Sequence, residues 1–134
     1  MGKKYKKASI GGLFAPLLFD ELHSQAYREL SGNAAKAYCH FKRIERIARK
    51  GVEQDSSVSF DFTYTEAAKL GFSRSTFNRV IADLLAKGFI NIVSQGGRRS
   101  CGMSNTRYQL SNRWRDYGKN TFIPKRRYPS ELRQ

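Results

Sequence analysis

Hydrophobic residues recur every three or four positions in the middle of the chain, separated by polar residues. This spacing puts them on one side of an α-helix, which predicts a helix over residues 73–87 with one buried face. Ser73 suits the capping position before such a helix, and Gly88 suits the position just beyond its end. The predicted buried stripe consists of Phe77, Val80, Ile81, Leu84 and Leu85.

The opposite side of this helix carries polar or small residues, so we expect it to face outward. Arg79 and Asn78 belong to this side, and their side chains can form paired hydrogen bonds with the edges of guanine and adenine, respectively. Ala82 lies at its centre and would let the helix backbone approach another molecule closely. The candidate base-contacting residues are therefore Ser75, Asn78, Arg79 and Ala82.

The residues just before this helix predict a second, shorter helix and a tight turn. We expect the shorter helix over residues 65–70, with Thr65 as its N-cap and Glu66 near its positive N-terminal end. Gly71 follows, and glycine is the residue that adopts the left-handed conformation of such a turn without strain. The sequence thus predicts two helices joined by a tight turn.

Three segments have the pattern of β-strands. Residues 59–64 alternate aromatic and polar side chains, which predicts a strand with one buried face. Residues 89–94 and 106–111 predict two further strands, and we expect the first strand to pair with them. The glycine-rich segment between these two strands carries Arg98 and Arg99.

The N-terminal part of the chain predicts one long helix and a less regular lead-in. Residues 13–22 are apolar and fit either a short helix starting near Pro16 or an extended segment, and residues 24–30 fit one or two helical turns. The longest helix is expected over residues 31–50, ending at Gly51. Its predicted buried stripe consists of Ala34, Ala37, Tyr38, Phe41, Ile44, Ile47 and Ala48.

Charge and size narrow the possible functions. A chain of 134 residues fits a single domain, and 25 Lys and Arg residues against 11 Asp and Glu residues give a net charge of +14. This excess favours a polyanionic partner. Lysines crowd residues 1–12, which we interpret as a flexible basic arm, and residues 118–134 as an irregular basic tail.

The predicted location is the cytoplasm. Two cysteines and the lack of a secretory leader favour a reducing compartment. No apolar run approaches the length that a membrane-spanning helix needs.

The helix pair resembles a known family of DNA-binding proteins. Ala67 and Gly71 stand four residues apart and are followed by Phe77 and Val80, which is similar to the helix-turn-helix of bacterial DNA-binding proteins. With the predicted hairpin after Gly88, residues 31–114 resemble winged-helix proteins of the transcription-regulator and plasmid or phage replication-initiator kinds. The resemblance implies an α+β, mostly α fold over residues 13–117, with a three-helix core and a small antiparallel β-sheet.

The same resemblance implies that the chain is a nucleoid-associated protein that binds double-stranded DNA. The helix over residues 73–87 would enter the major groove of double-stranded DNA, while the wing and the two termini contact phosphates. The backbone N–H groups of Ser75 and Thr76, at the start of that helix, would also face a phosphate. The candidate phosphate-binding residues are Arg74, Thr76, Arg98, Arg99, Lys125, Arg126, Arg127, Lys3 and Lys4.

Other chemistries have less support in the sequence. Cys39 and His40 are adjacent on a helix and point about 100° apart, so we expect no metal site, with Cys39 packed at the core edge and His40 at the surface. The scattered acidic residues form no catalytic constellation, so neither an enzyme nor a cofactor is expected. We expect no separate ligand-sensing domain, since 134 residues fit a single domain.

Two alternative functions and the oligomeric state stay open at this point. An RNA- or ribosome-associated winged helix would use exposed aromatic residues to stack bases, and Tyr5, Tyr117, Phe122 and Tyr128 are the ones that no predicted core stripe includes. A winged helix that binds only proteins would present an apolar recognition face. The chain also fits either a monomer or a homodimer.

Overall fold

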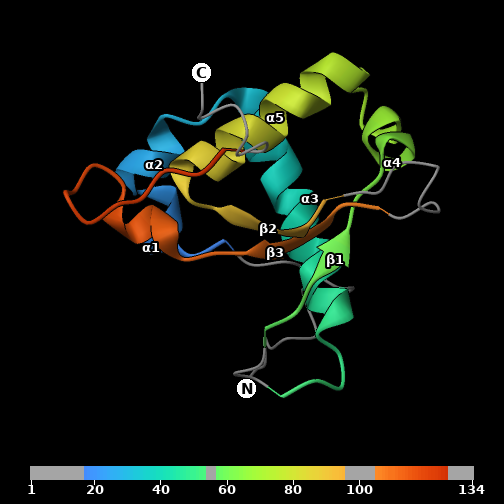
Figure 1. Ribbon diagram of the computed structural model, residues 1–134, viewed down its shortest axis with the longest axis horizontal. Helices are drawn as coiled ribbons and strands as arrows, with labels where there is room; N and C mark the ends of the chain where they lie inside the picture. Colours follow the sequence, from blue (N-terminus) through green and yellow to red (C-terminus); the bar gives the residue numbers. More distant parts are fainter. Residues whose placement is uncertain (1–16, 54–56, 96–104, 127–134) are drawn as a thin grey trace, which may run out of the picture.

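A computed structural model describes residues 17–53, 57–95 and 105–126. These residues form an α+β structure in which helices pack around a small antiparallel sheet (Figure 1). The elements follow in the order α1 (Phe19–Leu22), α2 (Gln25–Arg28), α3 (Gly32–Ala48), β1 (Phe60–Asp61), α4 (Tyr64–Lys69), α5 (Arg74–Lys87), β2 (Ile90–Ser94), β3 (Arg107–Leu110) and the 3-10 helix η3 (Arg113–Asp116).

Helix α5 forms as the sequence predicts, because both of its ends are fixed locally. Ser73 is the N-cap, and its hydroxyl accepts a hydrogen bond from the Thr76 N–H at 3.1 Å. Gly88 ends the helix in the left-handed conformation, with φ of 91°. The predicted stripe from Phe77 to Leu85 is buried, with each of its five side chains at most 2% exposed.

Helix α4 begins earlier than predicted. Its N-cap is Thr63 rather than Thr65, and Thr63 and Glu66 form a capping box. The Thr63 hydroxyl accepts the Glu66 N–H at 3.1 Å, and the Glu66 carboxylate accepts the Thr63 N–H at 2.9 Å. The helix therefore runs one residue ahead of the expected range, and Gly71 in the following turn has a φ of 92°.

The sheet has the strand order β1-β3-β2, and both pairs are antiparallel. β2 and β3 lie within a residue of the predicted ranges at each end, and the expected pairing of the first strand is confirmed, because Phe60 pairs with Tyr108. The predicted extent of that strand is wrong. Only Phe60 and Asp61 form β1, since the capping box at Thr63 turns the chain into α4 and takes Tyr64 with it.

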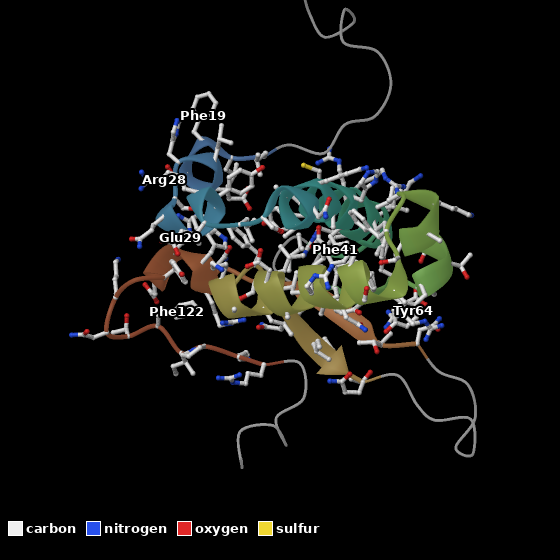
Figure 2. All side chains as sticks on the ribbon, turned by 90° about the horizontal axis from the view of Figure 1, so that it is seen from above. Phe19, Arg28, Glu29, Phe41, Tyr64 and Phe122 are labelled. Carbon is white, nitrogen blue, oxygen red and sulfur yellow. The ribbon has the colours of Figure 1, made fainter. Side chains whose placement is uncertain are left out.

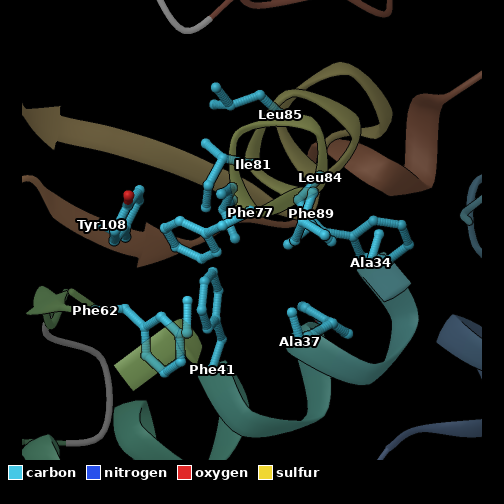
Figure 3. Packing of buried hydrophobic residues seen from close by; sticks show 14 of the residues in the cluster. Ala34, Ala37, Phe41, Phe62, Phe77, Ile81, Leu84, Leu85, Phe89 and Tyr108 are labelled. Atoms are coloured by element: carbon cyan, nitrogen blue, oxygen red, sulfur yellow. The ribbon is translucent and has the colours of Figure 1, made fainter. Parts of the chain in front are cut away.

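Aromatic side chains from α3, α5 and the sheet point toward one another and fill the core (Figure 3). The ring of Phe41 in α3 lies 4.9 Å from that of Phe62 and 5.7 Å from that of Tyr108. Aromatic contacts of this kind add to the stabilisation from burial. The core therefore fixes α3, α5 and the sheet relative to one another.

The far end of α3 extends past this core. Ile47 is 56% exposed and Ala48 is also exposed, so the prediction that the buried stripe includes them is wrong. Helical periodicity continues through both residues, but the elements that cover the earlier part of the stripe no longer lie against them. Burial of the stripe stops with Phe41, and Ile44 is half-buried.

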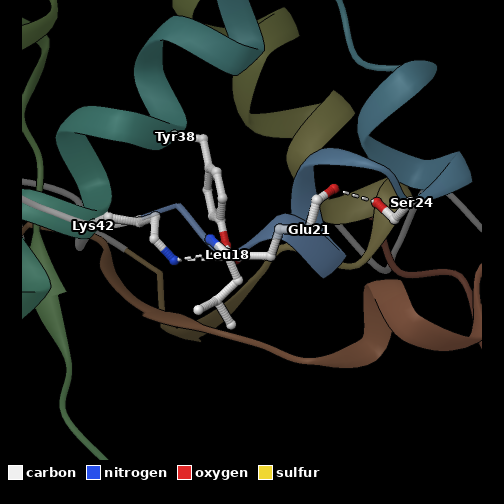
Figure 4. Close-up of polar contacts among 5 residues, drawn as sticks. All are labelled: Leu18, Glu21, Ser24, Tyr38 and Lys42. Atoms are coloured by element: carbon white, nitrogen blue, oxygen red, sulfur yellow. Dashed lines mark hydrogen bonds and ion pairs between the residues drawn. The ribbon is translucent and has the colours of Figure 1, made fainter.

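Helix α1 is attached to α3 through the buried carboxylate of Glu21. Glu21 of α1 is 3% exposed and accepts hydrogen bonds from the Leu18 N–H at 2.9 Å, from Lys42 Nζ at 2.9 Å and from the Tyr38 hydroxyl (Figure 4). Burial and the bond to Glu21 raise the pKa of Tyr38. A buried carboxylate is tolerated only when it is paired in this way, so the cluster ties α1 to α3.

Candidate nucleic-acid interface

The outward face of α5 carries the four candidate base-contacting residues together. Ser75, Asn78, Arg79 and Ala82 are exposed, on the side of the helix opposite the buried stripe. Thr76 beside them is half-buried. The arrangement therefore presents a guanidinium, an amide and a hydroxyl around one small residue on a rigid element.

The acidic residue on this helix is already neutralised. The Asp83 carboxylate forms an ion pair with Lys87 Nζ at 2.7 Å and accepts a hydrogen bond from the Ser31 N–H at 2.9 Å. By contrast, in the described ranges neither Arg74 nor Arg79 forms an ion pair. Both guanidinium groups keep an uncompensated charge that an anionic ligand would neutralise.

Tyr64 belongs to this site, although we predicted it as a strand residue. Its hydroxyl donates a hydrogen bond to Asn78 Oδ1 at 2.9 Å, and the Arg74 guanidinium lies 4.1 Å from the centre of its ring. The ring also packs edge-on against Phe77 of the core, with centroids 5.6 Å apart. Figure 2 shows Tyr64 beside the end of α5 that is nearest α4.

The sequence contains a pattern that places Tyr64 in a helix. Thr63 and Glu66 have the Ser/Thr-x-x-Glu spacing of a capping box, which puts Tyr64 in the first turn of a helix instead of at the end of a strand. The first turn of α4 then faces the start of α5 across the Gly71 turn. The contact with Asn78, fourteen positions away, needs the structure.

Interactions within α5 restrain two of the other candidates. The Thr76 N–H donates to the Ser73 cap, so that amide is not available to a phosphate. Arg79 Nη2 lies 3.4 Å from Thr76 Oγ1, a long hydrogen bond that leaves the remaining donors of the guanidinium exposed. Among the phosphate candidates at this end of α5, Arg74 is therefore better placed than Thr76.

Part of the basic tail is held near the other end of α5 by Arg113. This side chain donates to the carbonyl oxygens of Leu85 at 3.1 Å and Ile123 at 3.1 Å, and burial lowers its pKa. Figure 2 shows Phe122 at the end of α5 opposite Tyr64. Lys125 and Arg126 follow directly and are exposed. The other candidates, Arg98, Arg99, Arg127, Lys3 and Lys4, lie outside the described residues.

The structure also corrects the predicted placement of Cys39 on α3. Cys39 is exposed, so its predicted packing at the core edge is wrong. His40 is half-buried, and burial together with the charges of Arg43 and Lys36 lowers its pKa. In the part of the chain that the structure describes, no three His, Cys, Asp or Glu residues are grouped as metal ligands would be.

Over the described ranges, no helix combines the length and the apolar character that crossing a lipid bilayer requires. Comparison with protein-family models, with curated protein sequences and with solved structures finds no match to this chain.

Proposed function

We propose that this chain is a sequence-specific, double-stranded DNA-binding protein of the winged-helix kind, acting as a bacterial, plasmid or phage transcription regulator or replication-associated factor. The observation that carries the proposal is the outward face of α5, where Asn78 and Arg79 are exposed around Ala82 and the neighbouring Asp83 is neutralised. Side chains of these types read base edges in the major groove. The net charge of +14 supplies the attraction to the phosphate backbone.

The arrangement of elements also supports this proposal. A short helix, a glycine turn and a longer helix with an exposed polar face are followed by the antiparallel pair of β2 and β3, which is the order that winged-helix proteins have. In this proposal Arg74 contacts a phosphate beside the start of α5. Lys125 and Arg126, the wing residues Arg98 and Arg99, and the basic termini add further phosphate contacts.

The proposal is tested by selecting bound fragments from random duplex DNA and measuring affinities for the selected site by fluorescence anisotropy. We expect Arg79→Ala to lower the preference for the selected site over random duplex by about 1–3 kcal/mol. The matched control is Arg28→Ala, an exposed arginine on α2 that Figure 2 shows far from Tyr64. We expect this change to weaken both duplexes equally or to have no effect.

Salt dependence and competition separate this function from the two alternatives. A DNA-binding protein with several phosphate contacts loses affinity steeply as salt rises, whereas a protein-interaction domain has no such affinity to lose. Structured RNA that duplex DNA cannot displace would favour the RNA function instead. Two of the aromatic residues open to base stacking are engaged within the protein, because the Tyr117 ring packs against Phe122 and its hydroxyl donates to Glu29 at 2.6 Å.

Equal losses on the selected site and on random duplex after Arg79→Ala would contradict base reading by α5. Failure of the wild-type chain to enrich any common sequence would contradict the proposed function as a whole.

A further inference from the structure

The Asn78 amide has a defined orientation on the outward face of α5. The Tyr64 hydroxyl donates a hydrogen bond to Asn78 Oδ1 at 2.9 Å, which turns the carbonyl side of the amide toward α4. The opposite, NH2 side then faces away from Tyr64. Within the described residues the Asn78 amide nitrogen has no hydrogen-bond partner, so its two N–H groups are the donors offered to a ligand.

This orientation matters because the bases differ in what they present in the major groove. An asparagine that pairs with adenine uses both ends of its amide: Oδ1 accepts from adenine N6, and Nδ2 donates to N7. Guanine presents two acceptors, N7 and O6, which need donors only. The amide oxygen has two lone pairs and Tyr64 uses one of them, so adenine N6 would have to share Oδ1 with Tyr64, whereas guanine needs only the two N–H groups.

We propose that Tyr64 is a positioning residue that sets which base Asn78 reads, by holding Asn78 Oδ1 toward α4 so that the two N–H groups are the atoms offered to a base. The expected base is guanine in preference to adenine, which revises the pairing expected from residue types alone. This inference rests on the proposed function, since it concerns the same α5 face.

Tyr64 is well suited to hold this position. Its ring is supported on one side by Phe77 of the core at 5.6 Å and covered by the Arg74 guanidinium at 4.1 Å. The hydroxyl is therefore fixed by packing that a phenylalanine ring also provides. Tyr64→Phe removes the hydrogen bond to Asn78 and keeps the ring contacts, which isolates the role of the hydroxyl.

The test uses the full-length chain and the site selected from random duplex DNA. The base pair read by Asn78 is first identified as the position at which Asn78→Ala loses discrimination. At that position we expect the wild-type chain to bind guanine more tightly than adenine. In Tyr64→Phe the amide is free to turn Oδ1 toward adenine N6, and we expect the guanine-to-adenine preference to fall by about fivefold, the value of one hydrogen bond.

Two controls separate positioning from a general structural effect. Tyr117→Phe also removes a tyrosine hydroxyl that is bonded to a side chain, that of Glu29, and we expect it to leave the preference unchanged. In the double variant Tyr64→Phe with Asn78→Ala, the preference should equal that of Asn78→Ala alone, because Tyr64 acts through Asn78. A melting temperature for each variant shows that the compared proteins are folded.

The possible results separate failure of this inference from failure of the proposed function. Adenine preferred by the wild-type chain, an unchanged preference in Tyr64→Phe, or no position affected by Asn78→Ala would overturn this inference while leaving a site-specific DNA-binding protein. A wild-type chain that selects no common site would overturn the proposed function and this inference together.

Discussion

The buried carboxylate of Glu21 gives a sharp test of how the N-terminal helices are attached, and the perturbation is Glu21→Gln. The Glu21 side chain is 4% exposed and that of its partner Lys42 is 15% exposed. Glutamine keeps one oxygen for the Leu18 N–H and Lys42 Nζ, but it replaces the oxygen that accepts from the Tyr38 hydroxyl, and also from Lys42, with an NH2 group. At least one buried donor then loses its acceptor, and the Lys42 ammonium loses its counter-charge.

Leaving a buried donor unpaired costs about 1–3 kcal/mol, and breaking a buried ion pair costs about 3–5 kcal/mol. The two estimates overlap in what they count, so we expect Glu21→Gln to lower the free energy of unfolding by about 2–4 kcal/mol. The assay is urea unfolding followed by the fluorescence of Trp114, the one tryptophan of the chain. The loss is read from the shift of the midpoint at an unchanged slope.

Asp20→Asn is the matched control on the same helix. The Asp20 side chain is 77% exposed, and its carboxylate lies 3.6 Å from the Arg115 guanidinium. We expect this exposed pair to contribute about 0.5 kcal/mol or less. If Glu21→Gln were no more destabilising than Asp20→Asn, the reasoning about the buried cluster would be refuted. In an assay of the proposed DNA binding, folded Glu21→Gln protein should match the wild type, since the cluster contacts α3 and not the outward face of α5.

Two further predictions concern a turn and a pH dependence. Gly88→Ala places a Cβ 2.6 Å from the Trp114 backbone nitrogen at a φ of 91°, whereas Gly71→Ala has a φ of 92° but open space around it. In urea unfolding we expect a loss of about 3 kcal/mol or more for Gly88→Ala and of only about 1–2 kcal/mol for Gly71→Ala; similar losses for the two would rule out the steric argument. The hydrogen bond to Glu29 and burial raise the pKa of Tyr117 to about 12, and the same bond lowers the pKa of Glu29. Tyr117→Phe should therefore show its largest loss of stability relative to wild type at pH values between 4.5 and 10.0, the ordinary pKa values of the two groups. The loss should shrink both as the pH falls through the folded pKa of Glu29 and as it rises toward the folded pKa of Tyr117; a difference that does not change with pH would disprove the coupling.

The elements that the sequence predicted well are those whose limits are set by neighbouring residues. Helix α5 lies between a Ser73 cap and a Gly88 that must adopt positive φ, and its buried stripe repeats with the helical period. The strands β2 and β3 are similarly close to their predicted ranges. Two local patterns conflicted at Tyr64, and the helix cap decided its structure. The alternation of Phe60, Phe62 and Tyr64 predicted a strand, but the capping hydrogen bonds of Thr63 started a helix instead.

By itself, the sequence determined the order of the elements, the outward face of α5 and the strong positive charge, because periodicity, capping and composition depend on neighbours along the chain. Only the tertiary structure decided which side chains meet across elements. It buried Glu21 and left the adjacent Asp20 exposed, and it covered α3 as far as Phe41 but not at Ile47. It also placed Tyr64 against Asn78 and Arg74, because packing of α4 on α5 brings together residues that no local pattern relates.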